Sequence, residues 1–129
     1  MSQFVSIIVP CFNAERWLAE TLESALAQTW PDKEIIVIND GSTDGSLAVA
    51  QQFATRGVRV IDQPNRGASA ARNHGLRVAR GEFVQFLDAD DLISPDKVAA
   101  QIELLRTRPA GTVATCAWGR FQADPAKAQ

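Results

Sequence analysis

The sequence predicts an α/β fold built around a parallel sheet, and three observations carry this prediction. Short apolar or β-branched runs alternate with segments of helical periodicity, in strand–helix units of roughly 25 residues. Residues 34–38 are apolar throughout except for Glu34, as in a strand that is buried on both faces. The 129 residues are 46% hydrophobic and 22% charged, which is ordinary globular usage. We therefore expect residues 1–129 to form a single domain.

The residue pattern in the first half of the chain predicts three strands and two helices. In order, these are a strand at 4–9, a helix at 14–28, a strand at 34–38, a helix at 44–54 and a strand at 58–61. Pro10 ends the first strand, because it has no backbone N–H. Asn13 is a good N-cap for the first helix, and Ser42 or Thr43 is expected to cap the second.

The second half predicts two more helices and two more strands. In order, these are a helix at 68–79, a strand at 83–87, a helix at 95–106 and a strand at 112–117. The helix at 95–106 has the strongest start signal, with Ser94 as cap, Pro95 in the first turn and Asp96 as an early acid. In such sheets ligands bind beyond the carboxyl ends of the strands, so the residues after each strand are the functional candidates.

Charge and cysteine usage exclude several classes. Thirteen basic and 15 acidic residues give a net charge of −2, which favours neither nucleic acid nor an anionic membrane as a partner. Cys11 and Cys116 lie far apart with no Cys/His cluster, so no zinc site is expected. No apolar stretch approaches the roughly 20 residues of a membrane span, and no signal peptide is recognisable. We expect a protein of the cytoplasm or of the inner face of its membrane.

The strongest functional signal is the acidic run 88–91, which follows the strand at 83–87. Asp88, Asp90 and Asp91 place three carboxylates within four residues, and they repel one another unless a cation lies among them. Oxygen ligands of this kind suit Mg²⁺ or Mn²⁺. The alternative is a solvated acidic turn before the next helix, but the apolar strand that precedes it favours the metal site.

The other strand ends allow two interpretations each. Residues 10–13 contain no glycine-rich dinucleotide loop, and Asn13 can serve as a cap, a ligand contact or both. Asp40 can accept a hydrogen bond from a nucleoside or belong to a turn. A calcium loop starting at Asp40 is disfavoured, because its twelfth residue is Gln51 instead of Glu. Arg72, early in a helix, can bind a phosphate or pair with a nearby acid.

Four segments together resemble the nucleotide-sugar-binding half of an inverting glycosyltransferase of family 2. They are residues 5–13, 34–44, 65–73 and 81–91, in the family's order and spacing. The resemblance implies a Rossmann-like GT-A three-layer sandwich with a mainly parallel sheet. It also implies a donor, commonly a UDP-sugar, from which a hexose is transferred to a glycan or lipid-linked acceptor.

The resemblance also implies roles for individual residues. Asp40 would bind the base, and Arg72 would lie against the nucleotide. Asp88-Ala89-Asp90 matches the family's DxD motif, in which Asp88 approaches the ribose and Asp90 holds Mn²⁺ or Mg²⁺ on the diphosphate. The full expected sets are Pro10, Phe12, Asn13, Asp40, Arg72, Asp88 and Ala89 for the nucleotide sugar, and Asp88, Asp90 and Asp91 for the metal.

The family's catalytic base and acceptor-binding elements are expected beyond Gln129, so the resemblance predicts a C-terminally truncated GT-A domain. Such a chain would bind the donor without transferring the sugar. The alternatives are a non-catalytic nucleotide-binding module and a nucleotidyltransferase, although residues 10–13 lack the basic glycine-rich loop of the latter. Because only residues 112–117 remain to cover the strand at 83–87, we also expect that strand's edge to favour a homodimer.

Overall fold

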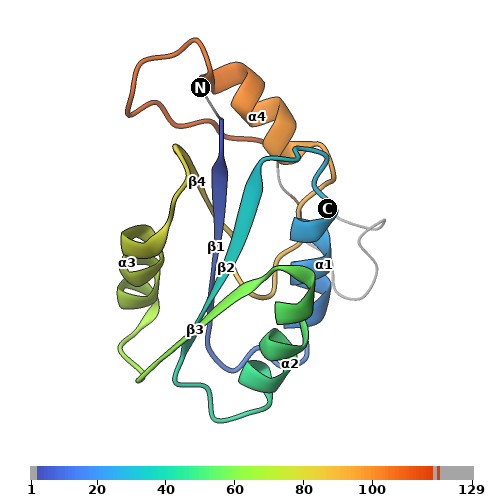
Figure 1. The fold of residues 1–129 in the computed structure, drawn as a ribbon, viewed down its shortest axis with the longest axis vertical. Helices are drawn as coiled ribbons and strands as arrows, with labels where there is room; N and C mark the ends of the chain where they lie inside the picture. The colour runs from blue at the N-terminus through green and yellow to red at the C-terminus, as the bar shows by residue number, and fades with distance from the viewer. Residues whose placement is uncertain (1–2, 118, 120–129) are drawn as a thin grey trace.

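The computed structural model describes residues 3–117 and 119 and contains the expected alternation of strands and helices. The elements are β1 (Val5–Cys11), α1 (Leu18–Leu26), β2 (Lys33–Asp40), α2 (Ser46–Gln52), the 3₁₀-helix η1 (Ala54–Arg56), β3 (Arg59–Gln63), α3 (Ala68–Val78), β4 (Phe83–Phe86) and α4 (Lys97–Leu105). Figure 1 shows them along the chain from blue to orange.

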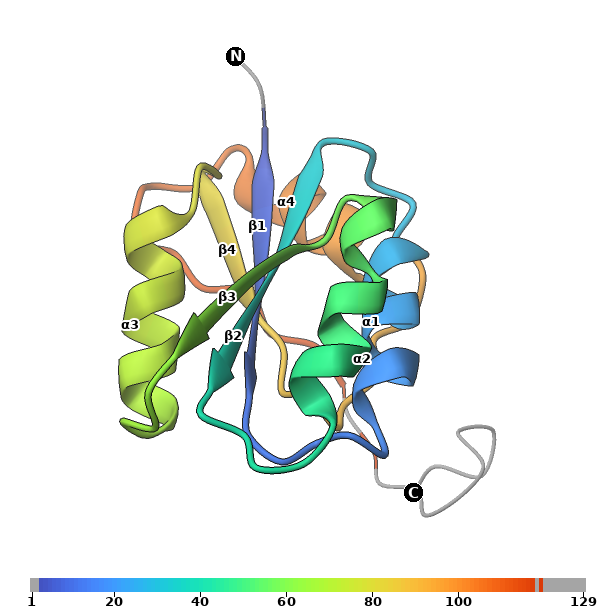
Figure 2. The ribbon, with the colours of Figure 1, turned by 60° about the horizontal axis from the view of Figure 1, so that its bottom comes forward.

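The strands form one parallel sheet in the order β3-β2-β1-β4. The chain moves outward from β1 to β2 and β3 and then returns to the other side of β1 with β4, as Figure 2 shows. The strand order therefore reverses at β1. The carboxyl ends of β1, β2 and β4 lie at the edge of the sheet where open α/β folds bind ligands.

Helices cover both faces of the sheet and produce three layers (Figure 2). On one face, α3 packs against Ile8, Ile36 and Ile38 through Ala71. Gly75 allows this close packing, because a Cβ at that position would lie 2.4 Å from Cγ2 of Ile8. On the other face, a larger core buries apolar side chains of β1, β2, α1, α2 and α4. The expected three-layer α/β sandwich is confirmed.

The predicted fifth strand at 112–117 is wrong, since these residues adopt no strand. The segment is rich in β-prone Thr and Val, but most of its side chains have no core to enter, and Val113 is 82% exposed. A β-prone run without burial or a pairing partner has little to stabilise it. Within the described residues, β4 is consequently an edge strand.

The predicted helix starts also need correction. The first helix begins at Leu18, and Asn13 lies outside it with a positive φ of 49°, so Asn13 is not its N-cap. The second helix begins at Ser46, where Asp44 Oδ1 accepts a hydrogen bond from the Ser46 N–H at 2.9 Å. The N-cap residue is Gly45, so neither Ser42 nor Thr43 caps this helix as predicted. In both places the loop before the helix is longer than predicted, and the polar side chains belong to that loop.

No helix in the described part of the chain is both long and apolar enough to cross a bilayer.

Candidate functional site

Asp40 ends β2 and organises the loop that connects β3 to α3. Its side chain is almost completely buried, at 3% exposure. Oδ1 accepts hydrogen bonds from Gln63 Nε2 at 2.9 Å and from the Arg66 N–H at 2.8 Å. Oδ2 accepts one from the Gly67 N–H at 2.9 Å and a longer one from Asn65 Nδ2 at 3.4 Å. Asp40 thus holds the turn that leads into α3.

Burial and hydrogen bonding act in opposite directions on the Asp40 carboxyl. Burial raises its pKa, whereas the hydrogen bonds from Gln63, Arg66 and Gly67 lower it, and the net result is a lowered pKa. The group is therefore ionised at neutral pH. A buried carboxylate with its lone pairs this well occupied is a rigid part of the structure.

The loops after β1 and β2 are joined by reciprocal hydrogen bonds. The Asn13 N–H donates to Ser42 Oγ at 3.0 Å, and Asn13 Oδ1 accepts from the Thr43 N–H at 2.8 Å. Phe12, next to this pair, is 47% exposed, and Pro10 is half-buried. The predicted nucleoside-contact residues 10–13 therefore lie at the carboxyl edge of the sheet. Pro10 does not end the first strand as predicted, because β1 continues to Cys11, and Phe12 and Asn13 follow on a loop that is bonded to the loop after β2.

The acidic run forms a compact cluster directly after β4. One carboxylate oxygen from each of Asp88, Asp90 and Asp91 lies within 4.8 Å of the other two, and all three residues are exposed. Ala89, between them, is buried at 6% exposure. The Asp91 N–H donates to the Asp88 carbonyl at 3.0 Å, which closes a turn within the acidic run.

Electrostatic repulsion is visible at Asp91. Burial, followed by the charges of Asp90 and Asp88, raises its pKa above the ordinary value for an aspartate. A divalent cation among the three groups would remove this repulsion. The cluster offers only oxygen ligands, so the residues fit Mg²⁺ or Mn²⁺ by the chemistry of the donor set.

Arg72 lies beside the acidic cluster. Its Nη2 is 3.4 Å from Oδ1 of Asp88, and both side chains are partly exposed. The sequence left two roles open for Arg72, namely pairing with an acid and facing a phosphate. The structure shows the ion pair, and the pair sets the guanidinium at the edge of the predicted metal site.

With this geometry, comparison with known families gives a clear result. The sequence profile described as Glycosyl transferase family 2 matches residues 6–128. The chain belongs to glycosyl transferase family 2.

Curated relatives of this family-2 chain are named as glycosyltransferases. The uncharacterized glycosyltransferase YibD of Escherichia coli is 47% identical over 93 residues, which cover 70% of this chain and 27% of YibD. Glycosyltransferase GlyG of Streptococcus pneumoniae is 35% identical over 116 residues, which cover 88% of this chain and 38% of GlyG. The chain therefore spans only about a quarter to two-fifths of these relatives' lengths.

Solved structures agree with the family. S. aureus TarS in complex with UDP-GlcNAc has a TM-score of 0.73 and 33% identity, over 80% of this chain and 32% of TarS. Mannosyltransferase PcManGT of Pyrobaculum calidifontis, in complex with GDP-Man and Mn²⁺, has a TM-score of 0.76 and 29% identity, over 81% of this chain and 32% of PcManGT. The GT-A fold expected from the resemblance is confirmed.

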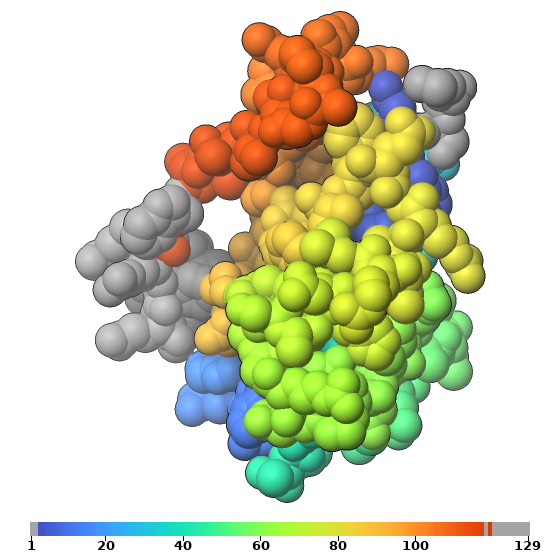
Figure 3. Space-filling view, turned by 90° about the vertical axis from the view of Figure 1, so that its left-hand side faces the viewer, coloured from blue at the N-terminus to red at the C-terminus, as the bar shows by residue number. Residues whose placement is uncertain are grey.

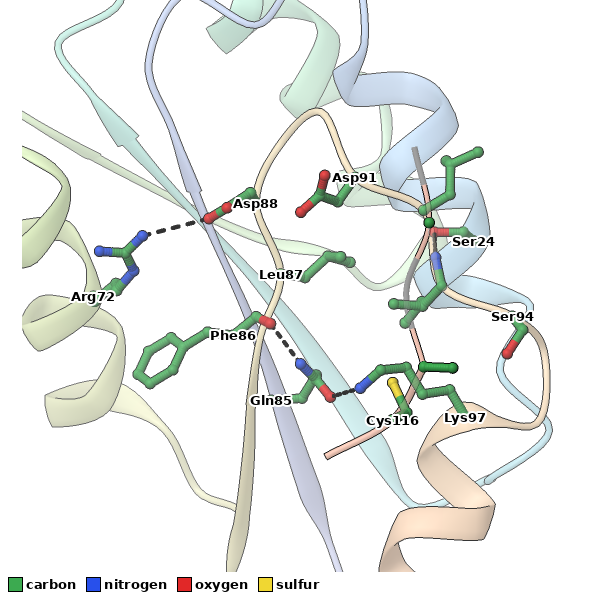
Figure 4. A pocket seen from close by; sticks show the side chains of 14 residues that line it. Ser24, Arg72, Gln85, Phe86, Leu87, Asp88, Asp91, Ser94, Lys97 and Cys116 are labelled. Atoms are coloured by element: carbon green, nitrogen blue, oxygen red, sulfur yellow. Dashed lines mark hydrogen bonds and ion pairs between the residues drawn. The ribbon is translucent and has the colours of Figure 1, made fainter. Parts of the chain in front are cut away.

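The family-2 chain has a cleft of about 850 Å³ beside β4. Figure 4 shows it extending from Asp88 and Asp91 toward Gln85, Lys97 and Cys116. Lys97 Nζ bonds Gln85 Oε1 at 2.5 Å, and burial lowers the pKa of this amine. Figure 3 shows a hollow in the surface at this place. It lies between the segment that follows α4 (dark orange) and the segment formed by β4 and the acidic loop (yellow to light orange).

Two residues that hold the site were missed by the sequence analysis. Gln63 was not considered at all, yet its amide bonds the Asp40 carboxylate. The sequence places Thr21 within a helix without any further role, yet its hydroxyl donates to the Ala89 carbonyl at 2.8 Å across 68 residues of sequence. Both are polar residues that are buried within apolar surroundings, and such residues need a hydrogen-bond partner. This need for a hydrogen-bond partner was the signal that the sequence offered for Gln63 and Thr21.

Proposed function

We propose that this chain binds a nucleoside diphosphate sugar, with a UDP-sugar favoured, as the donor part of a hexosyltransferase that inverts configuration. The observation that supports this most is the acidic cluster beside Arg72, at the edge where the strand order reverses. The proposed acceptor is a glycan or a lipid-linked saccharide. The proposed location is the cytoplasm or the inner face of its membrane.

The spacing of the strands suits such a donor. Asp40 is the last residue of β2 and Asp88 lies just after β4, and both strands flank β1. Neighbouring strands are 4.7–4.9 Å apart, so the two strand ends are separated by about 10 Å. We propose that the base lies near Asp40 and the diphosphate near Asp90, with Pro10, Phe12 and Asn13 lining the nucleoside pocket between them.

Each site residue then has a proposed role. Asp90, together with Asp88 and Asp91, would hold Mn²⁺ or Mg²⁺. Asp88 would also approach the ribose, and Arg72 would face the nucleotide. Ala89 contributes a backbone contact at the turn. When bound, the metal ion neutralises the charge that develops on the diphosphate leaving group.

Asp40 can reach the base through one specific atom. Oδ2 accepts one short hydrogen bond, from the Gly67 N–H at 2.9 Å, and its second contact is the long one of 3.4 Å from Asn65, whose amide also donates to the Asp40 carbonyl at 3.0 Å. We propose that an imide N–H of the base replaces that long contact. Uracil has such a group and cytosine lacks it. Guanine also has an N–H of this kind, and the similarity to PcManGT makes GDP the second nucleotide to test.

We propose none of the described residues as the base that takes the proton of the acceptor hydroxyl. Glu103 lies on α4 and pairs with Arg106 at 2.9 Å on an exposed face. The base predicted from the resemblance lies beyond Gln129, and this stays a prediction. On this proposal residues 1–129 bind the donor, and transfer uses the further length that the relatives possess.

The experiment is calorimetric titration of UDP, GDP and CDP with Mn²⁺ and with chelator. We expect UDP to bind at least about tenfold more tightly with Mn²⁺, and Asp90→Ala to remove most of that gain, because it takes away a direct ligand. Asp32→Ala, an exposed aspartate before β2, is the matched control and should keep the gain. Equal affinity of the wild-type chain with and without metal would overturn the proposed metal-dependent donor site.

A homodimer through β4 also stays a proposal. Val84 and Phe86 of this strand are 40% and 39% exposed, and within the described residues no strand pairs with its outer edge. Sedimentation at high protein concentration tests this, and a monomer throughout would exclude it.

A further inference from the structure

A row of polar side chains connects α1 to the acidic loop and to the start of α4. Thr21, Ser24 and Gln28 are three and four residues apart, so they point to the same side of the helix and of its C-terminal extension. Ser24 Oγ accepts from the Ile93 N–H at 3.3 Å. Gln28 donates to the Ser94 carbonyl at 2.7 Å and accepts from the Val98 N–H at 3.0 Å.

Thr21 differs from the other two because it bonds the acidic motif itself. Its Oγ1 donates to the Ala89 carbonyl at 2.8 Å. Thr21 is 1% exposed and Ala89 is 6% exposed, so this hydrogen bond is shielded from water. Ser24 and Gln28 hold the chain only from residue 93 onward. Thr21 thus bonds the peptide unit that lies between Asp88 and Asp90.

We propose that Thr21 is a positioning residue for the divalent-metal site, and this rests on the proposed function. Three carboxylates within 4.8 Å repel, and their repulsion tends to spread the loop that carries them. A fixed Ala89 carbonyl limits rotation of the peptide unit that joins Ala89 to Asp90. The Asp88 and Asp90 side chains therefore stay near each other before the ion arrives, which reduces the cost of assembling the site.

The geometry also explains why a hydroxyl is required there. Valine has the shape of threonine but cannot donate a hydrogen bond, so Thr21→Val would leave the buried Ala89 carbonyl without its donor. Serine keeps the donor and loses one methyl group. The pair Thr21→Val and Thr21→Ser thus separates the hydrogen bond from the packing of the side chain.

The test compares Mn²⁺ binding alone, by electron paramagnetic resonance, with UDP binding in Mn²⁺ and in chelator. For Thr21→Val we expect Mn²⁺ affinity and the metal-dependent gain in UDP affinity to fall about tenfold, the lower range for a residue that orients a ligand. UDP affinity in chelator should stay within about twofold of wild type, and Thr21→Ser should restore the gain.

Ser6→Ala is the matched control for a general loss of stability. Ser6 is also fully buried, and its hydroxyl bonds Glu34 Oε1 at 2.6 Å and accepts from the Gly81 N–H at 2.9 Å, at the opposite end of the sheet. It should lower the melting temperature while leaving Mn²⁺ affinity unchanged. If Thr21→Val fails to fold, Thr21→Ala removes the same hydroxyl and carries the test.

The outcomes separate the two proposals. Unchanged Mn²⁺ affinity in folded Thr21→Val or Thr21→Ala, or an equal loss in Ser6→Ala, would overturn the positioning role alone. A wild-type chain that binds Mn²⁺ without any gain in UDP affinity would contradict the proposed function, while Thr21 is still judged from Mn²⁺ affinity. A wild-type chain that binds no Mn²⁺ would overturn both.

Discussion

Asp40 and Asp91 lie at the same edge of one sheet, yet their surroundings move their pKa values in opposite directions. Asp40 is almost fully buried, which raises its pKa, but hydrogen bonds from Gln63, Arg66 and Gly67 lower it by more, so the net pKa is lowered. Asp91 is an exposed residue with a raised pKa, because partial desolvation of its carboxyl and then the charges of Asp90 and Asp88 oppose ionisation. The comparison teaches that the hydrogen-bond donors facing a carboxylate can outweigh its burial.

The two regions are therefore prepared differently for a ligand. The Asp40 region has its hydrogen bonds in place and needs no ion to be stable. The acidic loop carries unneutralised repulsion that a cation can relieve. We expect changes at Asp40 to affect folding first and changes in the acidic loop to affect ligand binding first.

The largest expected effect is that of Asp40→Ala on folding. The variant leaves the N–H groups of Arg66 and Gly67 without their acceptor, so we expect a loss of roughly 2–4 kcal/mol in the free energy of unfolding. Urea denaturation measures it, with Asp32→Ala as a control that should change by less than about 0.5 kcal/mol. Uridine nucleotide affinity should also fall, by about 1–3 kcal/mol. Unchanged stability would show that the loop does not depend on Asp40.

A second expected effect is stabilisation by metal, which should come from the acidic loop alone. Mn²⁺ at 100 times its dissociation constant adds about 2.7 kcal/mol to the folded state. We expect wild type and Asp40→Asn to show a similar rise in melting temperature on addition of Mn²⁺, and Asp90→Ala to show almost none. A rise in Asp90→Ala equal to that of wild type would place the metal elsewhere.

The third expected effect is a loss, on acidification, of the stability that the Asp40 carboxylate contributes. A lowered pKa means that the folded state favours the ionised carboxylate, so its stabilisation is present above the unfolded-state pKa. It is lost as pH falls below that ordinary value, near 3.8, through the lower folded-state value. The stability difference between wild type and Asp40→Asn should therefore shrink below pH 3.8 in urea titrations. A difference that is constant with pH would contradict this assignment.

The sequence predicted the strand–helix alternation and the acidic cluster well, because both depend on local patterns. Apolar runs such as residues 34–38 specify buried strands. Three aspartates within one turn lie close together whatever the position of that turn in the fold. The strand at 112–117 failed because β-propensity without burial does not determine structure. Asn13 failed as a cap because its side chain has a partner, Thr43, that lies thirty residues away.

The supporting contacts could not be predicted for the same reason. Gln63 meets Asp40, and Thr21 meets Ala89, only after the sheet order β3-β2-β1-β4 and the packing of α1 are fixed. A single sequence shows that such polar residues require partners, but it does not show which partners they find.

The smallest expected effect is that of Asp91→Asn without metal. A raised pKa means that the ionised Asp91 costs stability in the fold, and this cost disappears as pH falls through the folded-state pKa. Replacing the charge should do the same at pH 7 and raise the melting temperature in chelator by roughly 1–3 °C. Asp32→Asn, which removes an exposed charge before β2, should leave it unchanged.

The same variant should behave in the opposite way once Mn²⁺ is added. The charge that is unfavourable in the empty loop is then attracted to the ion, so wild type should become more stable than Asp91→Asn at saturating Mn²⁺. Differential scanning fluorimetry at pH 7, with chelator and with Mn²⁺, measures both states. A reversal of the order between the two conditions would identify Asp91 as part of the metal site. If Asp91→Asn were the more stable protein in both conditions, the site would consist of Asp88 and Asp90 alone.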